Sequence, residues 1–337
     1  MGQNIVVVGS SNTDMILKLD HIPQPGETIL GGEFITAAGG KGANQAVAAA
    51  RAGGSVTLVA RVGNDMFGKQ AVAGLVEKGI NVDHVHYDDA PSGVALIFVA
   101  KDGENSIGVG SGANLKLTPN DVGKASAQFA VADVVILQLE TPLQTVRAAA
   151  ELGHASGALV ILNPAPAQHL PADLLQKISI LTPNETEAEI LTGIKVVDDA
   201  SCRRAADALL AQGLETVIIT LGSRGAFVAT AAAQQLVGGF KVTPVDTTAA
   251  GDTFNGALAV AIAEGMSILE AVRFANAAAA ISVTRFGAQP STPSRTEIDA
   301  QLSAHAVHDG EQTCVAQQST AHDSCPRASG GLTVVHD

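Results

Sequence analysis

The sequence predicts an α/β protein in which helices cover both faces of a central, mostly parallel sheet, with a small second sheet beside it. After residue 130, short apolar runs alternate with helical patterns, and strands joined by helices in this way pair in parallel. Two earlier segments, 13–35 and 92–111, alternate apolar and polar residues as a partly exposed sheet does. Only 3% of the residues are aromatic, and abundant Ala and Gly suit closely packed layers.

The first hundred residues predict buried strands, two helices and exposed strands. The apolar run Ile5–Val8 ends at Gly9 and predicts a buried strand. Residues 13–35 hold two prolines and predict short, partly exposed strands. The Ala-rich pattern over Lys41–Ala52 predicts a helix, and the two glycines that follow end it. A further strand and helix are expected over Val56–Ala60 and Gly68–Lys78.

Residues 92–111 predict a hairpin. The apolar run Val94–Val99 forms its first arm, and the pair Asp102-Gly103 supplies the chemistry of a tight turn. Together with 13–35, this hairpin predicts a small sheet that stands apart from the main body.

The remainder of the chain predicts regular strand–helix units. Strands are expected at Val134–Gln138, Leu159–Leu162, Ile178–Leu181, Val217–Thr220, 225–230 and 235–242. Helices are expected at about 142–153, 185–192, 200–212, 251–264 and 268–284. Ligands of such folds bind at the carboxyl ends of the strands. From about residue 303 no periodicity is sustained, and we expect 303–337 to be a flexible tail.

Charge and cysteine content exclude several classes of protein. The net charge of −13 disfavours nucleic acid and anionic membranes as partners. The three cysteines are odd in number and form no CxxC, so neither a disulfide framework nor a zinc site is indicated. We find no signal peptide and no membrane-spanning run, and we therefore expect a cytoplasmic protein.

The segment Asp246–Gly256 carries the strongest functional signal. It lies between a strand and a long Ala-rich helix, and small residues at 249–251 allow a ligand to approach the backbone. The start of the helix leaves N–H groups unpaired, and its dipole favours negative charge, as a transferring phosphoryl group requires. Asp252 in the first turn is a candidate catalytic carboxylate. Asp is also favoured there as a cap, and the spacing alone leaves both interpretations open.

The segment Ala38–Gln45 is a second glycine-rich turn that leads into a helix. Its glycines allow a backbone path that bulkier residues cannot follow, and Lys41 and Asn44 could bind a polyhydroxyl ligand. A tight turn with a solvated lysine is the alternative.

Two other motifs are weak. Gly63–Lys69 has the spacing of a P-loop, but Gln70 stands where Ser or Thr should hold Mg²⁺. His84 and His86 lack further metal ligands nearby in sequence, and a surface strand explains them better.

Polar residues also follow other predicted strands. They are Asn12, Asp14, Glu140, Asn184, Glu187 and Leu221–Gly225. Each alone is more often a cap or turn residue, but parallel strands bring their carboxyl ends to one edge of a sheet. We therefore expect these groups to gather there.

These residues together resemble the ribokinase-like family of carbohydrate kinases over about residues 3–300. The motifs that match are Gly39–Asn44, Asp246–Gly256 and the Asn184–Glu187 pair. The resemblance implies a three-layer α/β sandwich over 1–302, with a β-sheet lid formed from about 13–35 and 92–111. In the family, the lids of two subunits clasp each other, which implies a homodimer.

The resemblance also implies the reaction and the residues that serve it. An enzyme of this kind transfers the γ-phosphoryl group of ATP to the 5-hydroxyl of D-ribose. Asp252 is expected to act as base, and Gly251 with Ala250 to form the anion hole. The expected sugar contacts are Asn12, Thr13, Asp14, Gly40, Lys41, Gly42, Asn44, Glu140 and Asp252. The expected nucleotide contacts are Asn184, Glu187, Thr220, Leu221, Gly222, Ser223, Arg224, Gly225, Gly251 and Asn276.

Two cations are expected on the same basis. Mg²⁺ would accompany the phosphates beside Asn184 and Glu187. K⁺ would activate the enzyme from a site formed by Asp246, Thr248, Ser282, Arg285, Gly287 and Ser291, largely through carbonyl groups. A helix end and loop is the alternative reading of 282–291.

The acceptor remains open among related compounds. Asp14 and Asn44 together favour vicinal hydroxyls, which makes 2-deoxyribose less suitable than ribose. Fructose, a nucleoside or a sugar phosphate are other acceptors, although Lys41 is the single cation at the sugar positions. A sugar-binding sensor without catalysis is the alternative from another class, and the intact Asp252 motif disfavours it.

Overall fold

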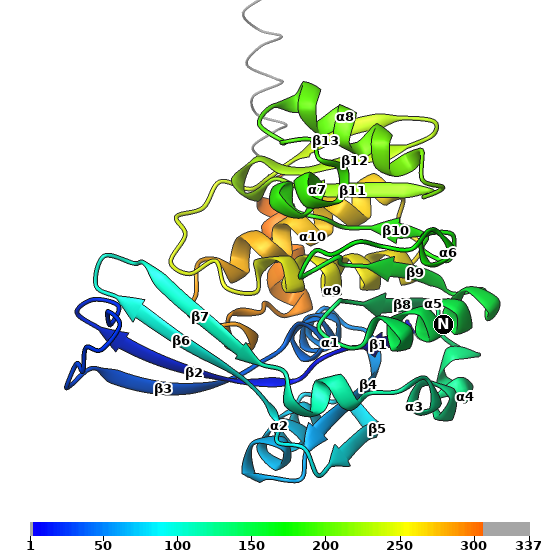
Figure 1. Cartoon of the computed structure of the whole chain (residues 1–337). Coiled ribbons are helices and arrows are strands. Elements are labelled where there is room, and N and C mark those ends of the chain that lie inside the picture. The colour runs from blue at the N-terminus through cyan, green and yellow to red at the C-terminus, as the bar shows by residue number, and fades with distance from the viewer. Residues whose placement is uncertain (1–2, 306–337) are drawn as a thin grey trace, which may run out of the picture. The chain divides into compact units, whose positions relative to one another are not determined.

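A nine-stranded sheet runs through the centre of the protein, with strand order β13-β12-β11-β10-β9-β8-β1-β4-β5 (Figure 1). The computed structural model describes residues 3–305. All neighbours from β11 to β5 pair in parallel, while β11–β12 and β12–β13 are antiparallel. The predicted fold class, a mostly parallel α/β sheet, is therefore confirmed.

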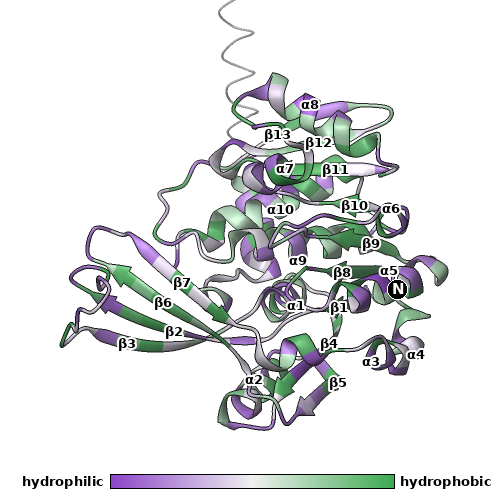
Figure 2. Ribbon diagram, viewed as in Figure 1, coloured by the Kyte–Doolittle hydropathy of each residue, from purple (hydrophilic) through white to green (hydrophobic). Residues whose placement is uncertain are grey.

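The strands of this sheet are short and mostly apolar. Their bounds are β1 Asn4–Val8, β4 Ser55–Gly63, β5 Asn81–Asp88, β8 Val134–Leu137, β9 Leu159–Leu162, β10 Ile180–Leu181, β11 Thr216–Thr220, β12 Gly225–Thr230 and β13 Gln234–Gly238. Figure 2 colours β8 and β9, in the middle of this sheet, as hydrophobic. Every residue of β8 is buried, as both faces of a parallel sheet are when helices cover them.

Helices form a layer on each side of the sheet. The helices α1 (Lys41–Arg51), α9 (Ala250–Ala263) and α10 (Ile268–Ser282) pack on one another over one face. The other helices are α2 Met66–Glu77, α3 Pro119–Lys124, α4 Ser126–Phe129, α5 Leu143–Ala155, α6 Ala172–Leu175, α7 Glu185–Thr192 and α8 Asp199–Leu210. No helix among residues 3–305 is long and apolar enough to cross a membrane.

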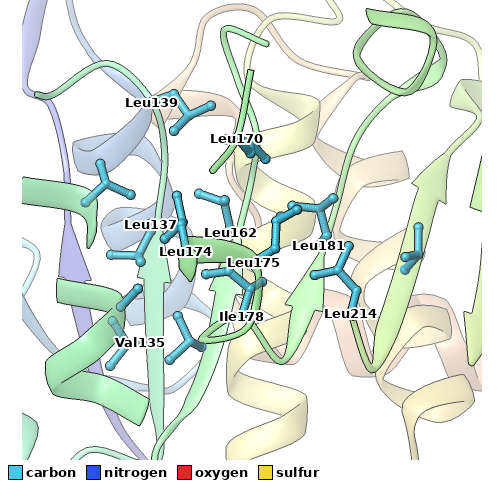
Figure 3. Packing of buried hydrophobic residues seen from close by; sticks show 14 of the residues in the cluster. Val135, Leu137, Leu139, Leu162, Leu170, Leu174, Leu175, Ile178, Leu181 and Leu214 are labelled. Atoms are coloured by element: carbon cyan, nitrogen blue, oxygen red, sulfur yellow. The ribbon is translucent and has the colours of Figure 1, made fainter. Parts of the chain in front are cut away.

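The core beneath α5, α7 and α8 is built from alternate residues of the strands. Val135 and Leu137 of β8 and Leu162 of β9 belong to one buried cluster with Leu174 and Leu181 (Figure 3). Their neighbours in the strands face α1, α9 and α10, where small alanines let the helices approach closely. This close packing brings the beginnings of α1 and α9 together.

A separate four-stranded sheet projects beside the main one, in blue and cyan at the left of Figure 1. Its order is β3-β2-β6-β7, with bounds β2 Asn12–Leu19, β3 Glu33–Gly39, β6 Gly93–Ala100 and β7 Asn105–Gly110. The central pair β2–β6 is parallel and the outer pairs are antiparallel. The segments expected to form a small sheet therefore do so, and β3 continues to Gly39, at the start of α1.

His84 and His86 lie on β5, an edge strand of the main sheet that pairs in parallel with β4, so the predicted surface strand is confirmed. Other elements differ from the predictions. The short helices α3 and α4 were not predicted. Residues 303–305, which we expected to begin the tail, are still helical, and 306–337 lie outside the described residues together with Cys314 and Cys325.

Candidate active site

The helices α1 and α9 cross so closely that their first turns share a site. Gly256 lies at the crossing, where a Cβ atom would stand 2.5 Å from Ala48 Cβ and 2.7 Å from the Ala49 nitrogen. Only glycine allows two helices to come this near. As a result, side chains from the start of α1 reach Asp252, which lies one turn before Gly256.

Asp252 is a buried carboxylate held by two amide side chains of α1. Asn44 Nδ2 donates to its Oδ2 at 3.1 Å, and Gln45 Nε2 donates to its Oδ1 at 2.9 Å. Burial raises the pKa of Asp252, while the Lys41 ammonium and the two amide donors act against that rise. The carboxylate is thus kept out of water but supplied with hydrogen-bond donors, and a buried carboxylate with such opposing influences on its pKa is a candidate functional group.

The backbone at the start of α9 is open and strained. Ala249 has φ 57°, a left-handed conformation that costs a non-glycine residue about 1 kcal/mol or more. No side chain caps the first turn. A Cβ on Gly251 would meet nothing within 4 Å, so its backbone faces free space. These features make the N-terminus of α9 suitable for an anionic group.

Several charged groups surround Asp252. Burial lowers the pKa of Lys41, but the carboxylates of Asp252, Glu140 and Glu187 outweigh it and the pKa is raised. Burial, with Glu140 and Asp252 as nearby like charges, raises the pKa of Asp14 to about 6. Burial also raises the pKa of Glu187. One ammonium and four carboxylates therefore share one region.

The turn before α1 lies against the start of β2. Gly40 has φ 89°, and a Cβ there would stand 2.6 Å from the Asn12 nitrogen. A Cβ on Gly39 would stand 2.3 Å from the Asp14 carboxylate. Glu140, which follows β8, accepts hydrogen bonds from the Lys41 backbone at 3.1 Å and from the Ser10 hydroxyl. The predicted sugar residues of three separate segments are thus brought together.

Asn114 supports this region, although it belongs to no motif that the sequence analysis singled out. It lies in the 3₁₀ turn η1 (Gly112–Lys116), directly after the small sheet. Its Nδ2 donates to Asn12 Oδ1 at 2.7 Å, and its Oδ1 accepts from the Ser11 backbone at 2.9 Å. With its oxygen occupied, Asn12 presents its amide hydrogens elsewhere.

A cavity of about 540 Å³ opens beside the start of α9. Its lining is mainly apolar, with Phe240, Val242 and Val283 among the walls. Of the predicted nucleotide contacts, those that line it are Thr220, Gly222, Ser223, Gly225, Gly251 and Asn276. The Asn276 amide donates to the carbonyls of Val237 and Gly238, which fixes its orientation.

The other predicted nucleotide residues lie outside this lining. Leu221 is buried, and Arg224 in the turn η2 (Gly222–Arg224) pairs with Glu185 at 2.7 Å. Asn184 and Glu187 form a capping box at the start of α7. The Glu187 backbone N–H donates to Asn184 Oδ1 at 2.8 Å, and the Asn184 backbone N–H donates to Glu187 Oε2 at 2.9 Å.

The predicted cation residues come from two loops that meet. Asp246 Oδ2 accepts from the Gly287 backbone at 2.8 Å, and its Oδ1 accepts from the Thr248 backbone at 2.9 Å. Although burial acts in the opposite direction, these hydrogen bonds hold the pKa of Asp246 below its ordinary value. The hydroxyls of Ser282 and Ser291 donate to nearby carbonyls, and Arg285 pairs with Glu297 at 2.6 Å.

A buried polar network lies behind Asp252, and the sequence did not reveal it. Gln45 Nε2 also donates to Asn163 Oδ1 at 3.1 Å, and Gln138 Nε2 donates to Gln45 Oε1 at 2.6 Å. On the far side, Asn255 Nδ2 donates to the Gly251 carbonyl at 2.8 Å. The network contacts both the carboxylate and the first turn of α9.

These features point to one type of enzyme. A buried carboxylate at a helix N-terminus, a glycine-rich turn lined with polar groups and an adjoining apolar cavity match the arrangement expected of an α/β sugar kinase. The chain belongs to the pfkB family of carbohydrate kinases, whose sequence pattern matches residues 2–295. The predicted class of enzyme, an ATP-dependent sugar kinase, is thereby confirmed.

Individual relatives are similar over most of the chain. The ribokinase of Haemophilus influenzae is 47% identical over 88% of this chain and 97% of its own length. The deoxyribokinase of Salmonella typhimurium is 39% identical over 89% of this chain and 99% of its own. The structure of Arabidopsis thaliana ribokinase complexed with ribose and ATP has a TM-score of 0.84 and 35% identity, and covers 90% of this chain and 99% of that one.

Proposed function

We propose that this chain transfers the γ-phosphoryl group of ATP to the 5-hydroxyl of D-ribose. The position of Asp252 carries the proposal. Its carboxylate lies at the start of α9 between the polar residues of the glycine-rich turn and the apolar cavity, with donors from Asn44 and Gln45. The relatives named ribokinase support ribose as acceptor.

In the proposed step, the sugar hydroxyl attacks the γ-phosphorus and its proton passes to Asp252. The bond between the γ-phosphorus and the bridging oxygen breaks, and ADP leaves with the electron pair. A carboxylate is a weak base, but the loose transition state of phosphoryl transfer makes modest demands on the nucleophile. The N–H groups of Ala250 and Gly251 would stabilise the charge on the phosphoryl oxygens.

The sugar would lie on the turn before α1. Asn12, Asp14, Asn44 and Glu140 offer both donors and acceptors, which matches adjacent hydroxyl groups. Asn44 Oδ1 is buried without a partner, and a sugar hydroxyl would satisfy it. Thr13, Gly40, Lys41 and Gly42 complete the proposed contacts.

The nucleotide would occupy the cavity beside α9. Its apolar walls suit a purine ring, and the glycines of 222–225 let the backbone approach phosphates. The nucleotide would also be contacted at the edge of the cavity, by Asn184, Glu187, Leu221 and Arg224. The need for ATP also favours the cytoplasm as the location.

The residues present fit the two expected cations. One Glu187 oxygen accepts from the Asn184 backbone, and the remaining lone pairs can accept from water on Mg²⁺. Mg²⁺ supplies positive charge that neutralises the phosphate oxygens. Asp246 stays ionised, and Thr248, Ser282, Arg285, Gly287 and Ser291 can offer carbonyls to K⁺ beside the loop that leads to α9.

We also propose a homodimer through the small sheet. Paired residues lie on the same face, so Leu96 and Phe34 fall on one face while Ile107 and Val109 fall on the other. All four are exposed, at 49%, 62%, 56% and 55%. A sheet that exposes apolar side chains on both faces suits a second subunit that covers part of it.

The test is ADP release with Mg-ATP and a panel of acceptors. D-Ribose should be used in preference to 2-deoxyribose, fructose and nucleosides, and replacement of K⁺ by Na⁺ should slow turnover. 2-Deoxyribose is the second candidate because one relative is a deoxyribokinase. A preference for 2-deoxyribose would replace ribose in the proposal, and ATP binding without turnover on any sugar would indicate a sensor.

A further inference from the structure

Gln45 is a fully buried side chain in direct contact with Asp252. Its exposed fraction is 0%, and its amide has a partner for every polar atom. Nε2 donates to Asp252 Oδ1 at 2.9 Å and to Asn163 Oδ1 at 3.1 Å, while Oε1 accepts from Gln138 Nε2 at 2.6 Å. Both amide hydrogens and the carbonyl oxygen are thus engaged by protein groups.

These partners allow one orientation of the Gln45 amide. Asn163 Oδ1 and Asp252 Oδ1 both require the Gln45 NH₂ group on their side, and the Gln45 oxygen then accepts from Gln138 Nε2. The Oε1 atom of Gln138 itself is buried without a partner. Asn163 is oriented in turn, because its Nδ2 donates to the Thr182 backbone carbonyl at 3.3 Å and its oxygen must then face Gln45. A chain of buried amides, anchored on the Thr182 carbonyl directly after β10, therefore aims a donor at Asp252.

The groups around Asp252 disfavour its ionised form, so a hydrogen-bond donor to the carboxylate affects its protonation state. The charged groups that face it are Lys41 of α1, Glu140 after β8, Asp14 of β2 and Glu187 of α7. Burial and the three carboxylates favour the neutral acid, and Lys41 is the one cation among these groups. Hydrogen bonds to the charged form favour ionisation.

We propose that Gln45, oriented by Gln138 and Asn163, is a positioning residue that keeps Asp252 ionised and turns its Oδ2 toward the acceptor hydroxyl. Oδ1 is occupied by Gln45, and Oδ2 accepts from Asn44 with a lone pair left for the substrate proton. The inference rests on the proposed role of Asp252 as base. Gln45 acts through Asp252 and needs no contact with sugar or nucleotide.

The test compares Gln45→Met with the wild-type protein. Methionine has nearly the shape of glutamine but no amide, so packing is kept and the donor is lost. The pKa of Asp252, followed by ¹³C NMR of the labelled carboxyl and assigned with Asp252→Asn, should rise by about one to two units. The acid limb of the kcat profile should move to higher pH by the same amount, with the KM for ATP within about twofold of wild type.

Gln128→Met is the matched control. Gln128 lies on α4, its Oε1 atom is buried without a partner, and it has no link to Asp252. This variant should keep the wild-type carboxyl titration and pH profile. The inference would be overturned if the Gln45→Met protein folds and both the Asp252 pKa and the acid limb of its kcat profile are the same as in the wild-type protein.

Two further measurements separate the possible failures. If Gln45→Met does not fold, Gln138→Met serves instead, because it keeps Gln45 and releases its amide from the fixed orientation. A smaller rise in the Asp252 pKa is expected there, and no rise would overturn the inference. If wild-type protein phosphorylates no sugar, the proposed function fails, while the carboxyl titration still decides the role of Gln45.

Discussion

Asn44 Nδ2 lies 3.1 Å from Asp252 Oδ2, and this hydrogen bond joins residues 208 positions apart in the chain. It connects the glycine-rich turn before α1 with the first turn of α9. The glycine-rich turn, to which we assign the sugar, and Asp252, to which we assign the role of base, therefore form one unit whose geometry depends on how α1 packs against α9.

Replacement of Asp252 by asparagine tests the base directly. Asparagine keeps the shape of the side chain but cannot accept the sugar proton, so kcat should fall by roughly 10²–10⁴. The affinity for ATP, measured by calorimetry, should change little, because the cavity is untouched. Turnover close to wild type would remove Asp252 from the role of base.

Gly256→Ala should separate α1 from α9. Its Cβ would stand 2.5 Å from Ala48 Cβ and 2.7 Å from the Ala49 nitrogen, and relief of that overlap should cost about 1–3 kcal/mol of unfolding free energy. Urea denaturation measures the change. The control is Gly74→Ala on α2, where the nearest atom, Lys78 Nζ, is 3.6 Å away and a gain of about 0.4–1 kcal/mol is expected. Equal behaviour of the two variants would contradict the close crossing.

Asp14 should titrate near pH 6, because burial and the charges of Glu140 and Asp252 raise its pKa to about 6 from an ordinary 3.8. A carboxyl whose folded pKa lies above its unfolded value opposes folding when ionised. The destabilisation that ionised Asp14 causes should therefore be relieved as pH falls from about 6 toward 4, and its contribution to the free energy of unfolding should become less unfavourable. Carboxyl ¹³C NMR measures the titration, and Glu140→Gln should move it to lower pH. A midpoint near 4 in the wild-type protein would contradict the burial of these charges together.

Asn114→Ala should weaken sugar binding while sparing ATP. The substitution removes the donor that occupies Asn12 Oδ1 at 2.7 Å, so the Asn12 amide loses its fixed orientation. Loss of such a buried hydrogen bond should raise the KM for ribose about tenfold. Steady-state kinetics with each substrate varied in turn gives both constants, and Asn81→Ala at the exposed start of β5 is the control. Equal increases in the two KM values would show a general loss of structure instead.

The fold class was predictable from the sequence because its signals are local. Apolar runs such as Val134–Leu137 and the Ala-rich helix that begins at Ala250 reveal their elements without reference to the rest of the chain. The edge strand Asn81–Asp88 was harder to assign, because one exposed side gives it the alternation of a surface strand. For α3, the Thr118–Asp121 capping box was the available signal.

The candidate site was predictable only where its residues lie in a motif. Asp252 and Lys41 stand in glycine-rich turns that lead into helices, and such turns are recognisable in sequence. Gln138, Asn163 and Asn114 are single polar residues in unrelated segments. The packing of α1 on the sheet gives Gln138 and Asn163 their partners, and the approach of η1 to the start of β2 gives Asn114 its partners. Side-chain networks of this kind depend on tertiary distances that spacing does not encode.

The position of the phosphate on the product decides whether this protein phosphorylates the 5-hydroxyl of ribose. Protein, Mg-ATP and D-ribose would be incubated, and the product examined by ¹H–³¹P correlated NMR. We expect a sugar phosphate whose phosphorus couples to the two protons on carbon 5, formed by wild-type protein and lost in Asp252→Asn. A phosphorus coupled to the proton on carbon 1, or inorganic phosphate with no sugar phosphate, would contradict that expectation.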